Sequence, residues 1–406
     1  MTLPSAAERA EGRASLAFLV FLALMISVVA MTIDAVLPAL DAIDAELGFA
    51  DPNDRQLVII MVFIGMGLSQ PVFGPLADSI GRKRTAMLGW GVFIAGTLMG
   101  MLAETPLEML AGRFLQGLGA GGPRIVAIAV VRDLYAGRPM ARVLSLVITI
   151  FMLVPMFAPL IGQRVEMLGG WRAIFGLYLA LALVSGGWYL VGVPETLDPT
   201  ARRALSPRPV IAAFIEVLWT RSTMLYTFAA MLVFGAFVVY LATAQQVLEE
   251  GYDLGPLFPY AFGALAFAFA LAAIGNGRLV MRVGMRPLAR AALVQMTAVG
   301  GVAALITAGD GLPPLWLFMV LMSLIFFSVA VLFPNLNALA LEPLGHIAGT
   351  AASVVNTVTM LGAVPVGYVI ARSYDGSVGP LFLGFAVLGA GALALVMLAD
   401  RARAAT

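Results

Sequence analysis

Asp34 and Arg113 are the charged side chains whose positions most directly suggest chemistry. Asp34 lies in the apolar stretch 15–40 and Arg113 in the apolar stretch 107–131, each six residues from one end of its stretch. If the two stretches form antiparallel helices, both charges lie at the same depth, about 9 Å from the same end of the helix pair. A charge in such a segment persists where it faces a cavity, pairs or carries an ion. We expect Asp34 to bind a proton and Arg113 to stabilise its ionised form; the alternative is a purely structural ion pair.

Further polar side chains lie where they could line a cavity with this pair. Arg124 follows Arg113 by eleven residues, and eleven helical steps of about 100° return to within about 20° of the same face. Gln116 shares that face, so we expect both to line a substrate cavity, with Gln116 donating a hydrogen bond to substrate or to Asp34. For Arg124 the alternative is a side chain that snorkels to the membrane interface. In the second half of the chain, Tyr240 and Gln245 are candidates in a Phe- and Met-rich setting that suits promiscuous binding.

The run GPLADSIGRKR (74–84) concentrates charge in an otherwise apolar chain and ends in three cations around Lys83. The cations could anchor a short cytoplasmic loop, form a gate or bind a phosphate or nucleic acid. Asp78 favours a gate, because a pure anchor needs no acid. No G-x-x-x-x-G-K-[ST] pattern surrounds Lys83, which is the only lysine, so a P-loop ATPase is excluded.

The cationic run has a second copy at half the length of the chain. GRLVMRVGMRP (277–287) aligns with it without gaps at an offset of 203 residues. The matches are Gly74 with Gly277, Leu76 with Leu279, Gly81 with Gly284, and Lys83 with Arg286. This indicates a duplicated chain with one loop in each half, and it removes the nucleic-acid interpretation. Met281 replaces the acid in the second copy, so we expect a one-sided gate.

The elements that position these residues follow from composition. The chain has 406 residues, of which 61% are hydrophobic and 12% charged, far from the soluble range. Twelve apolar segments of membrane-spanning length predict an all-α membrane protein of two pseudo-symmetric six-helix bundles. They lie near residues 15–40, 56–77, 85–103, 107–131, 143–166, 172–193, 222–248, 257–277, 287–308, 314–341, 350–371 and 380–399.

The segments group into a domain at 1–193, a linker at 194–221 and a domain at 222–406, with an amphipathic helix expected at 210–219. The first apolar stretch is too long for a signal peptide, so we expect it to be a retained spanning helix. With both termini in the cytoplasm, eighteen Lys and Arg residues, including Arg9, Arg13 and Arg203, fall on the cytoplasmic side and four on the other. This bias predicts a multi-pass membrane protein with both termini in the cytoplasm.

Composition also excludes several classes of site. There is no cysteine and only one histidine, so thiol chemistry and a histidine metal cluster are excluded. We expect no catalytic residues, no enzymatic activity, no metal and no cofactor. The expected partners are a small molecule, a proton and membrane lipid around a monomer, with no nucleic acid.

Short motifs along nearly the whole chain resemble the major facilitator superfamily. The loop signature of that superfamily matches at Gly74, Leu76, Ala77, Asp78, Gly81, Arg82 and Lys83, with Ser79 departing from it. RFLQGLGAG (113–121) is similar to a motif of proton-driven drug exporters, and VPMFAPLIGQ (154–163) resembles their helix-5 antiporter signature, with Gln163 departing from it. DAVLPAL, VRDLYAGR, GWRAIF and PETL point to the bicyclomycin/chloramphenicol-resistance (Bcr/CflA) branch.

The resemblance implies a rocker-switch antiporter of the bacterial inner membrane that exports small amphipathic drugs, such as chloramphenicol-like compounds, in exchange for protons. It implies a gating loop at Gly74, Asp78, Gly81, Arg82 and Lys83. It implies a helix-5 motif at Pro155, Ala158, Pro159 and Gly162 whose packing seals the cavity. Two other functions stay open: proton-coupled uptake of a metabolite or small anion on the same scaffold, and a membrane sensor that transports nothing.

Overall fold

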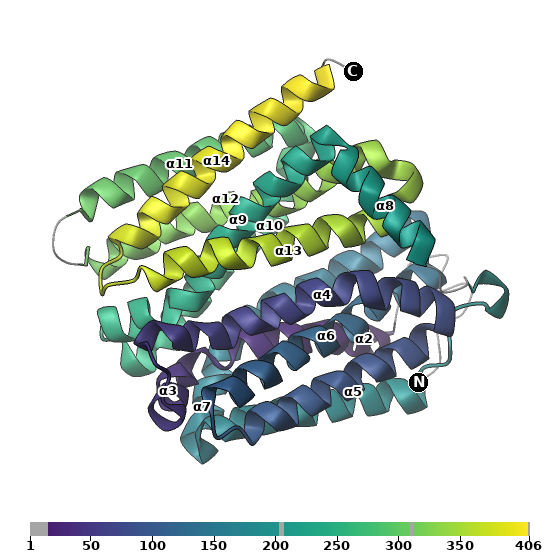
Figure 1. Ribbon diagram of the computed structural model, residues 1–406, viewed down its shortest axis with the longest axis horizontal. Helices are drawn as coiled ribbons and strands as arrows, with labels where there is room; N and C mark the ends of the chain where they lie inside the picture. Colours follow the sequence, from purple (N-terminus) through teal and green to yellow (C-terminus); the bar gives the residue numbers. More distant parts are fainter. Residues whose placement is uncertain (1–14, 203–206, 309–311, 405–406) are drawn as a thin grey trace. The chain divides into compact units, whose positions relative to one another are not determined.

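The protein is helical throughout the part that the structure describes. The computed structural model describes residues 15–202, 207–308 and 312–404, and long helices make up most of these ranges (Figure 1). Three of the predicted cytoplasmic cations, Arg9, Arg13 and Arg203, lie outside the described residues.

The helices follow the apolar segments closely. In the first half they are α2 (Leu16–Asp34), α3 (Leu40–Leu47), α4 (Leu57–Ile80), α5 (Arg82–Met101), α6 (Pro106–Leu134) and α7 (Gly137–Gly192). In the second half they are α8 (Pro207–Trp219), α9 (Arg221–Gln245), α10 (Phe258–Val283), α11 (Met285–Ile306), α12 (Leu315–Leu341), α13 (Ala348–Arg372) and α14 (Gly379–Ala404).

The number of membrane-length helices agrees with the twelve predicted segments. Nine helical stretches of the described chain are long and apolar enough to cross a membrane. Two of them each hold two helices: α7 turns at Gly169 and Gly170, and the stretch Leu315–Arg372 joins α12 to α13. Helix α5, with 20 residues, completes the set of twelve. The all-α membrane fold predicted from the sequence is confirmed.

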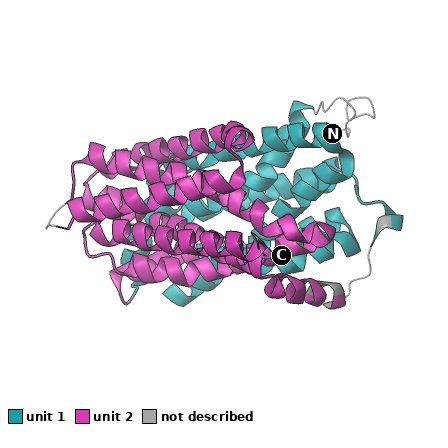
Figure 2. Ribbon diagram, turned by 90° about the horizontal axis from the view of Figure 1, so that it is seen from above, with its two compact units in different colours: residues 1–49, 61–206 teal, residues 50–60, 207–406 magenta. Residues whose placement is uncertain are grey.

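The chain forms two compact units, coloured separately in Figure 2. Unit 1 comprises residues 1–49 and 61–206, and unit 2 comprises residues 50–60 and 207–406. The first residues of α4 therefore belong to unit 2, although the rest of that helix belongs to unit 1. The predicted domain limits at 193 and 222 stay a prediction.

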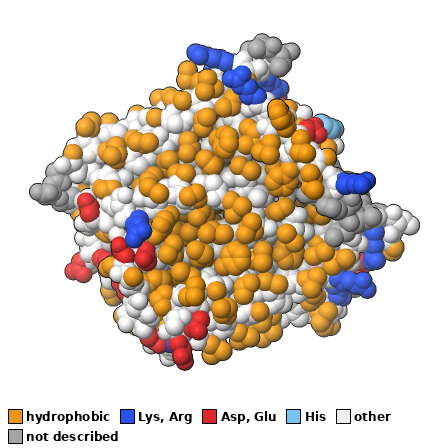
Figure 3. Space-filling view, in the orientation of Figure 1, with side chains coloured by type: hydrophobic (Ala, Val, Ile, Leu, Met, Phe, Trp, Pro, Cys, Tyr) orange, Lys and Arg blue, Asp and Glu red, His pale blue; other side chains and the backbone are white. Residues whose placement is uncertain are grey.

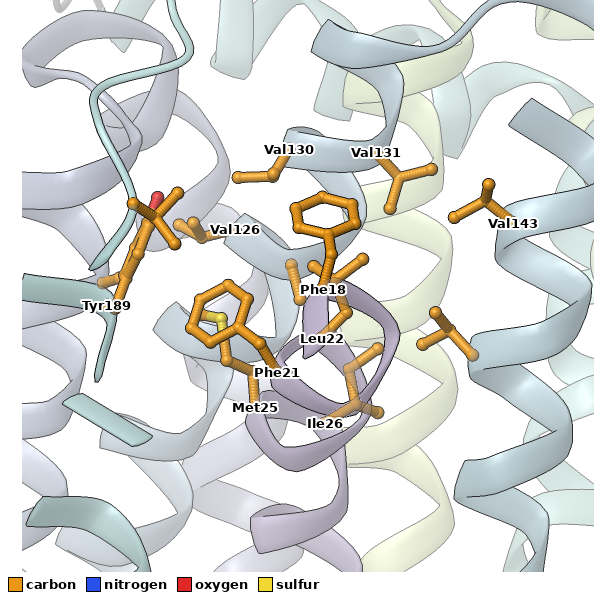
Figure 4. Packing of buried hydrophobic residues seen from close by; sticks show 14 of the residues in the cluster. Phe18, Phe21, Leu22, Met25, Ile26, Val126, Val130, Val131, Val143 and Tyr189 are labelled. Carbon is orange, nitrogen blue, oxygen red and sulfur yellow. The ribbon is translucent and has the colours of Figure 1, made fainter. Parts of the chain in front are cut away.

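The core of unit 1 joins α2 to α6 and α7. Phe18, Phe21 and Leu22 of α2 point among Val126 and Val130 of α6 (Figure 4). Val143 and Tyr189, near the two ends of α7, belong to the same cluster. Burying each large apolar side chain contributes about 1.5–3 kcal/mol in water, but between helices in lipid close packing is the main source of stability.

The core of unit 2 is rich in aromatic rings from α9, α10 and α12. Phe237 of α9 lies 5.8 Å from Phe269 and 6.2 Å from Phe326 between ring centroids. Phe269 and Phe326 meet edge to face at 6.0 Å. Edge-to-face and tilted pairs at these distances are favourable because the positive edge of one ring meets the negative face of the other.

Hydrophobic side chains cover much of the outer surface. Figure 3 shows them over the middle of the helices, with Lys and Arg near the start of α5 and near the C-terminal end of α14, and with Asp and Glu gathered mainly near α3. Leu168 and Val191 of α7 are examples, with 88% and 90% of their surface exposed. Apolar surface on this scale is stable against lipid rather than water.

Candidate functional site

Asp34 lies at a break in the first long helix. Helix α2 ends at Asp34, followed by a short 3₁₀ turn at Leu37–Ala39 and then by α3. The assumption that one continuous helix reaches Leu40 was therefore wrong. The physical reason is Pro38, which has no N–H to donate to the main-chain oxygen of Asp34, four residues earlier, and whose ring crowds that oxygen.

The carboxyl group of Asp34 is buried at this break. Only 5% of its surface is exposed. Among the residues that the structure describes, none forms a hydrogen bond or ion pair with the Asp34 side chain. A charged carboxylate without a partner is costly to bury, and taking up a proton removes that cost. Asp34 is thus placed where gain and loss of a proton would be coupled to changes in its surroundings.

Arg113 is fully buried in α6 and ties three helices of unit 1 together. Its Nη2 donates to the main-chain oxygen of Thr32 at 2.7 Å, two residues before Asp34. Its Nη1 donates to Oε1 of Gln116 at 2.9 Å, and Nε2 of Gln116 donates to Oγ1 of Thr97 on α5 at 3.0 Å. The network brings Arg113 to the chain segment that carries Asp34, while direct coupling of the two charges stays a prediction.

Gly162 of the helix-5 motif packs against the break beside Asp34. A Cβ at Gly162 would lie 1.9 Å from the main-chain oxygen of Ala35, which no real side chain tolerates. Ala158 lies one helical turn earlier and is fully buried. Pro159 is also buried and Pro155 is half-buried. The small residues therefore let α7 approach the backbone next to the buried carboxyl group.

Arg124 of α6 is half-buried, eleven residues beyond Arg113. No residue in the described ranges forms a hydrogen bond or an ion pair with it. A half-buried guanidinium without a partner can bind an anion or a polar substrate group. Its predicted role in a substrate cavity stays a prediction.

The predicted gating loop forms an ion-pair cluster inside unit 1. Arg82, which is almost fully buried, donates to both carboxylate oxygens of Asp133 at the end of α6, at 2.9 and 3.1 Å. It also pairs with Asp78, one turn earlier in the chain. Thr196 donates to Asp133 at 2.9 Å. A fork that binds one carboxylate with two nitrogens is the strong form of this interaction, so the end of α6 is held to the loop. Gly74 lies in α4, and a Cβ at this position would meet no atom within 4 Å.

Glu195 caps the N-terminus of α5. Its carboxylate accepts the main-chain N–H groups of Arg82 at 2.9 Å and Lys83 at 3.2 Å, which have no partner within the helix. Gly81 makes this possible, since it holds φ at +100° and a Cβ there would lie 2.4 Å from the Glu195 carboxylate. The positive end of the helix adds electrostatic attraction to the hydrogen bonds.

The second copy of the loop keeps the backbone shape but not this cap. Gly284 has φ at +86° and precedes α11 as Gly81 precedes α5. In unit 2 the loop arginine Arg286 lies 3.4 Å from Glu342, directly after α12, and 3.7 Å from Asp400 of α14. The carboxylate partners thus come from other helices, and the loop itself has Met281 in place of the acid.

Two predicted cavity residues lie deep in unit 2. The ring of Tyr240 stacks on Phe262 at 5.7 Å and meets Phe326 edge to face at 4.7 Å. Gln245 is fully buried at the end of α9 and donates to Glu249 at 3.4 Å. Tyr240 is therefore part of the aromatic core of unit 2, and the role of both residues in substrate binding stays a prediction.

Residues 52–56 form a polar cluster with the ends of α9 and α13, which we call the α4 latch. Nε2 of Gln56 donates to Oε1 of Gln246 at 2.6 Å, and Nε2 of Gln246 donates to Oδ1 of Asn53 at 2.8 Å. Arg55 forms an ion pair with Glu250. All of these residues belong to unit 2, and Gln56 and Gln246 are almost completely buried. The latch fixes the start of α4 to unit 2.

A pocket of about 460 Å³ lies beside the α4 latch. Arg55, Glu250 and Tyr374 are among its lining residues. Burial raises the pKa of Tyr374 to about 12, so its hydroxyl stays protonated at neutral pH and donates to the main-chain oxygen of Gln246 at 3.2 Å.

Sequence reasoning missed the partners of the predicted residues. Asp133 and Glu195 lie in motifs that were noted only for their family resemblance, and their role as acceptors depends on contacts across more than fifty residues. The acids of VRDLYAGR and PETL, each at the end of an apolar segment, were the available signal. Nothing in the local sequence marks the pairing of Gln56 with Gln246, 190 residues away.

Comparison with known proteins is consistent with this architecture. The chain is 29% identical to the bicyclomycin resistance protein homolog of Haemophilus influenzae over 378 residues, 91% of this chain and 92% of the relative. It is 29% identical to a chloramphenicol resistance protein of Pseudomonas aeruginosa, covering 79% of this chain and 75% of the relative. It is 35% identical to the multidrug resistance protein MdtL of Escherichia coli, covering 55% and 56%.

Solved structures share the fold at low identity. A partially occluded inward open structure of the xylose transporter XylE from E. coli matches with a TM-score of 0.72 at 12% identity, covering 94% of this chain and 97% of that one. The family model of the Major Facilitator Superfamily matches residues 20–367. With the membrane-length helices of its described residues and the loop cluster around Arg82, this chain is a multi-pass membrane protein that belongs to the major facilitator superfamily.

Proposed function

We propose that this protein exports small amphipathic drug-like compounds from the bacterial cytoplasm in exchange for protons. The observation that carries the proposal is Asp34, a carboxyl group buried at a helix break and without a partner in the described chain. Relatives named for resistance to bicyclomycin, chloramphenicol and multiple drugs support drugs as the substrate class.

In the proposed mechanism the proton and the substrate compete for one group, Asp34. Asp34 binds a proton when the site faces outside and loses it when the site faces the cytoplasm. Because α7 packs on Ala35 at the break, movement of α7 changes the surroundings of Asp34. Substrate and proton then favour different states, which is the condition for coupled exchange. Arg113 sets the local charge next to Thr32, and Gln116 and Arg124 contribute polar groups.

The remaining roles are assigned in the same scheme. Tyr240 and Gln245 contribute to substrate binding. The loop cluster of Arg82, Asp78 and Asp133 acts as the cytoplasmic gate. The protein works as a monomer in the inner membrane with both termini in the cytoplasm, an orientation that the distribution of Lys and Arg favours.

A second candidate function is proton-coupled movement of a small organic anion. Arg124 favours it, because a half-buried arginine without a partner in the described chain suits a carboxylate or phosphate. The direction of net transport then becomes uptake rather than export.

The test uses purified protein in liposomes that contain a pH-sensitive dye, with an imposed proton gradient. We expect chloramphenicol-type or cationic drugs to trigger proton flux above that of protein-free liposomes. Flux triggered by small organic anions and not by drugs would replace export by the second candidate. No flux with any compound would leave a non-transporting membrane protein and overturn both proposals.

A further inference from the structure

A second pocket lies on unit 1, at the junction of α4, α5 and the end of α7. Its volume is about 660 Å³. Four apolar residues line it: Ile80, Met87, Leu88 and Leu190. Leu88 and Leu190 keep 51% and 55% of their surface exposed. An apolar wall that stays open on the outside of a membrane protein is suited to a hydrocarbon chain.

Three cations stand around this apolar wall: Lys83, Arg84 and Arg202. Lys83 donates to the main-chain oxygen of Val193 at 3.1 Å, which fixes its position. Arg84 and Arg202 are exposed, and no residue that the structure describes bonds to or pairs with either side chain. Two guanidinium groups thus remain available to a ligand.

Glu195, the acid in the lining, does not neutralise the three cations. The carboxylate of Glu195 accepts main-chain N–H groups of Arg82, Lys83 and Leu197, so it is turned toward the helix end. The lining carries three positive charges and one negative charge. The lining of the pocket therefore combines a cationic part with an apolar part.

We propose that this pocket binds an anionic phospholipid. Guanidinium groups match phosphate oxygens through two parallel hydrogen bonds, and Arg84 and Arg202 would hold the headgroup phosphate. Leu88 and Leu190 would contact the start of an acyl chain. A neutral drug leaves both guanidinium groups unused, and a free phosphate leaves the apolar wall unused. The amphiphile is the ligand that uses both parts.

The pocket adjoins the loop cluster through two residues, so a bound lipid would affect the stability of the start of α5. Lys83 and Glu195 line the pocket, and Glu195 also caps the helix that begins at Arg82. A bound phosphate next to Lys83 adds negative charge near the N-terminus of α5, which stabilises that helix end. The proposal does not depend on the transport function proposed above.

The test is native mass spectrometry of the purified protein titrated with phosphatidylglycerol or phosphatidylcholine. We expect the first phosphatidylglycerol to bind about tenfold more tightly than phosphatidylcholine. The double variant Arg84→Gln/Arg202→Gln should lose about tenfold in affinity for phosphatidylglycerol, from the loss of two cations near the lipid. Leu88→Ser/Leu190→Ser, which keeps all charges, should bind both lipids several-fold more weakly.

The matched control is Arg278→Gln/Arg282→Gln, which removes the same charge from exposed positions on the second copy of the loop, outside the pocket. This variant should bind as the wild type does. An equal loss in the control would show general attraction by charge and overturn the pocket. Wild-type affinity in either pocket variant would also overturn it, as would complete displacement of the lipid by excess glycerol 3-phosphate.

Discussion

At the scale of single residues, the sequence predicts the chemistry-bearing side chains but not their partners. Asp34 and Arg113 stand out because each interrupts an apolar stretch. In the structure Arg113 binds Thr32 and Gln116, and its direct coupling to Asp34 stays a prediction. The reason is that depth along two helices can be read from spacing, whereas side-chain direction depends on how the helices rotate and where α2 ends.

The fork of Arg113 gives a stability prediction. Arg113→Lys keeps the charge but has one nitrogen in place of the two that bind Gln116 and Thr32, so we expect one of these buried acceptors to lose its partner. We expect a loss of about 1–3 kcal/mol in the free energy of unfolding. Thermal unfolding in detergent, followed by tryptophan fluorescence, would measure it. Arg164→Lys, at an exposed site of α7, is the control, and equal midpoints for the two variants would contradict the network.

At the scale of elements, the apolar segments of the sequence predict the long helices well, but they do not predict where a helix breaks. Helices α4, α6, α9 and α12 begin and end within a few residues of their predicted segments. The break at Asp34 and the capping of α5 by Glu195 were not predicted. The break follows from Pro38, which the apolar pattern does not register, and the cap depends on a residue beyond α7.

Gly162 tests the contact between α7 and the break. Gly162→Ala places a Cβ on the main chain of Ala35, so α7 must move and the surroundings of Asp34 must change. We expect the drug-triggered proton flux of proteoliposomes to fall more than tenfold. Gly176→Ala, in the part of α7 beyond the turn at Gly169 and Gly170, is the matched control, because a Cβ there meets nothing within 4 Å. Equal flux in both variants would show that the close approach has no role in transport.

The two loop glycines separate backbone strain from the Glu195 cap. Gly284→Ala adds only the cost of a positive φ, about 1–2 kcal/mol. Gly81→Ala adds the same cost and also displaces the Glu195 carboxylate. We therefore expect the thermal midpoint of Gly81→Ala to be lower than that of Gly284→Ala. Identical midpoints would mean that the cap contributes nothing to stability.

At the scale of the whole molecule, the boundary between unit 2 and unit 1 falls within one helix, α4. The α4 latch assigns residues 50–60 to unit 2, and α4 then continues into unit 1. The twelve segments and the duplicated loop could be predicted from the sequence, because hydrophobic length and a 203-residue offset are local signals. The latch could not, because it joins side chains about 190 residues apart.

The ion pair of the α4 latch gives a prediction at this scale. Arg55→Glu places two acids together and should open the latch, so we expect drug-triggered proton flux to fall several-fold. Glu250→Arg should do the same by placing two cations together. The double variant Arg55→Glu/Glu250→Arg restores opposite charges and should recover most of the flux. A double variant as inactive as the singles would show that the pair is not what these residues contribute.

The central claim is that Asp34 carries the proton for drug exchange. The most direct test is drug-triggered proton flux in proteoliposomes with wild type, Asp34→Asn and Glu104→Gln, the last being an exposed carboxylate as control. We predict full flux in wild type and Glu104→Gln and none in Asp34→Asn, with unchanged thermal midpoints showing that all three are folded. Drug-triggered flux that survives in Asp34→Asn would place the proton on another group and contradict the claim.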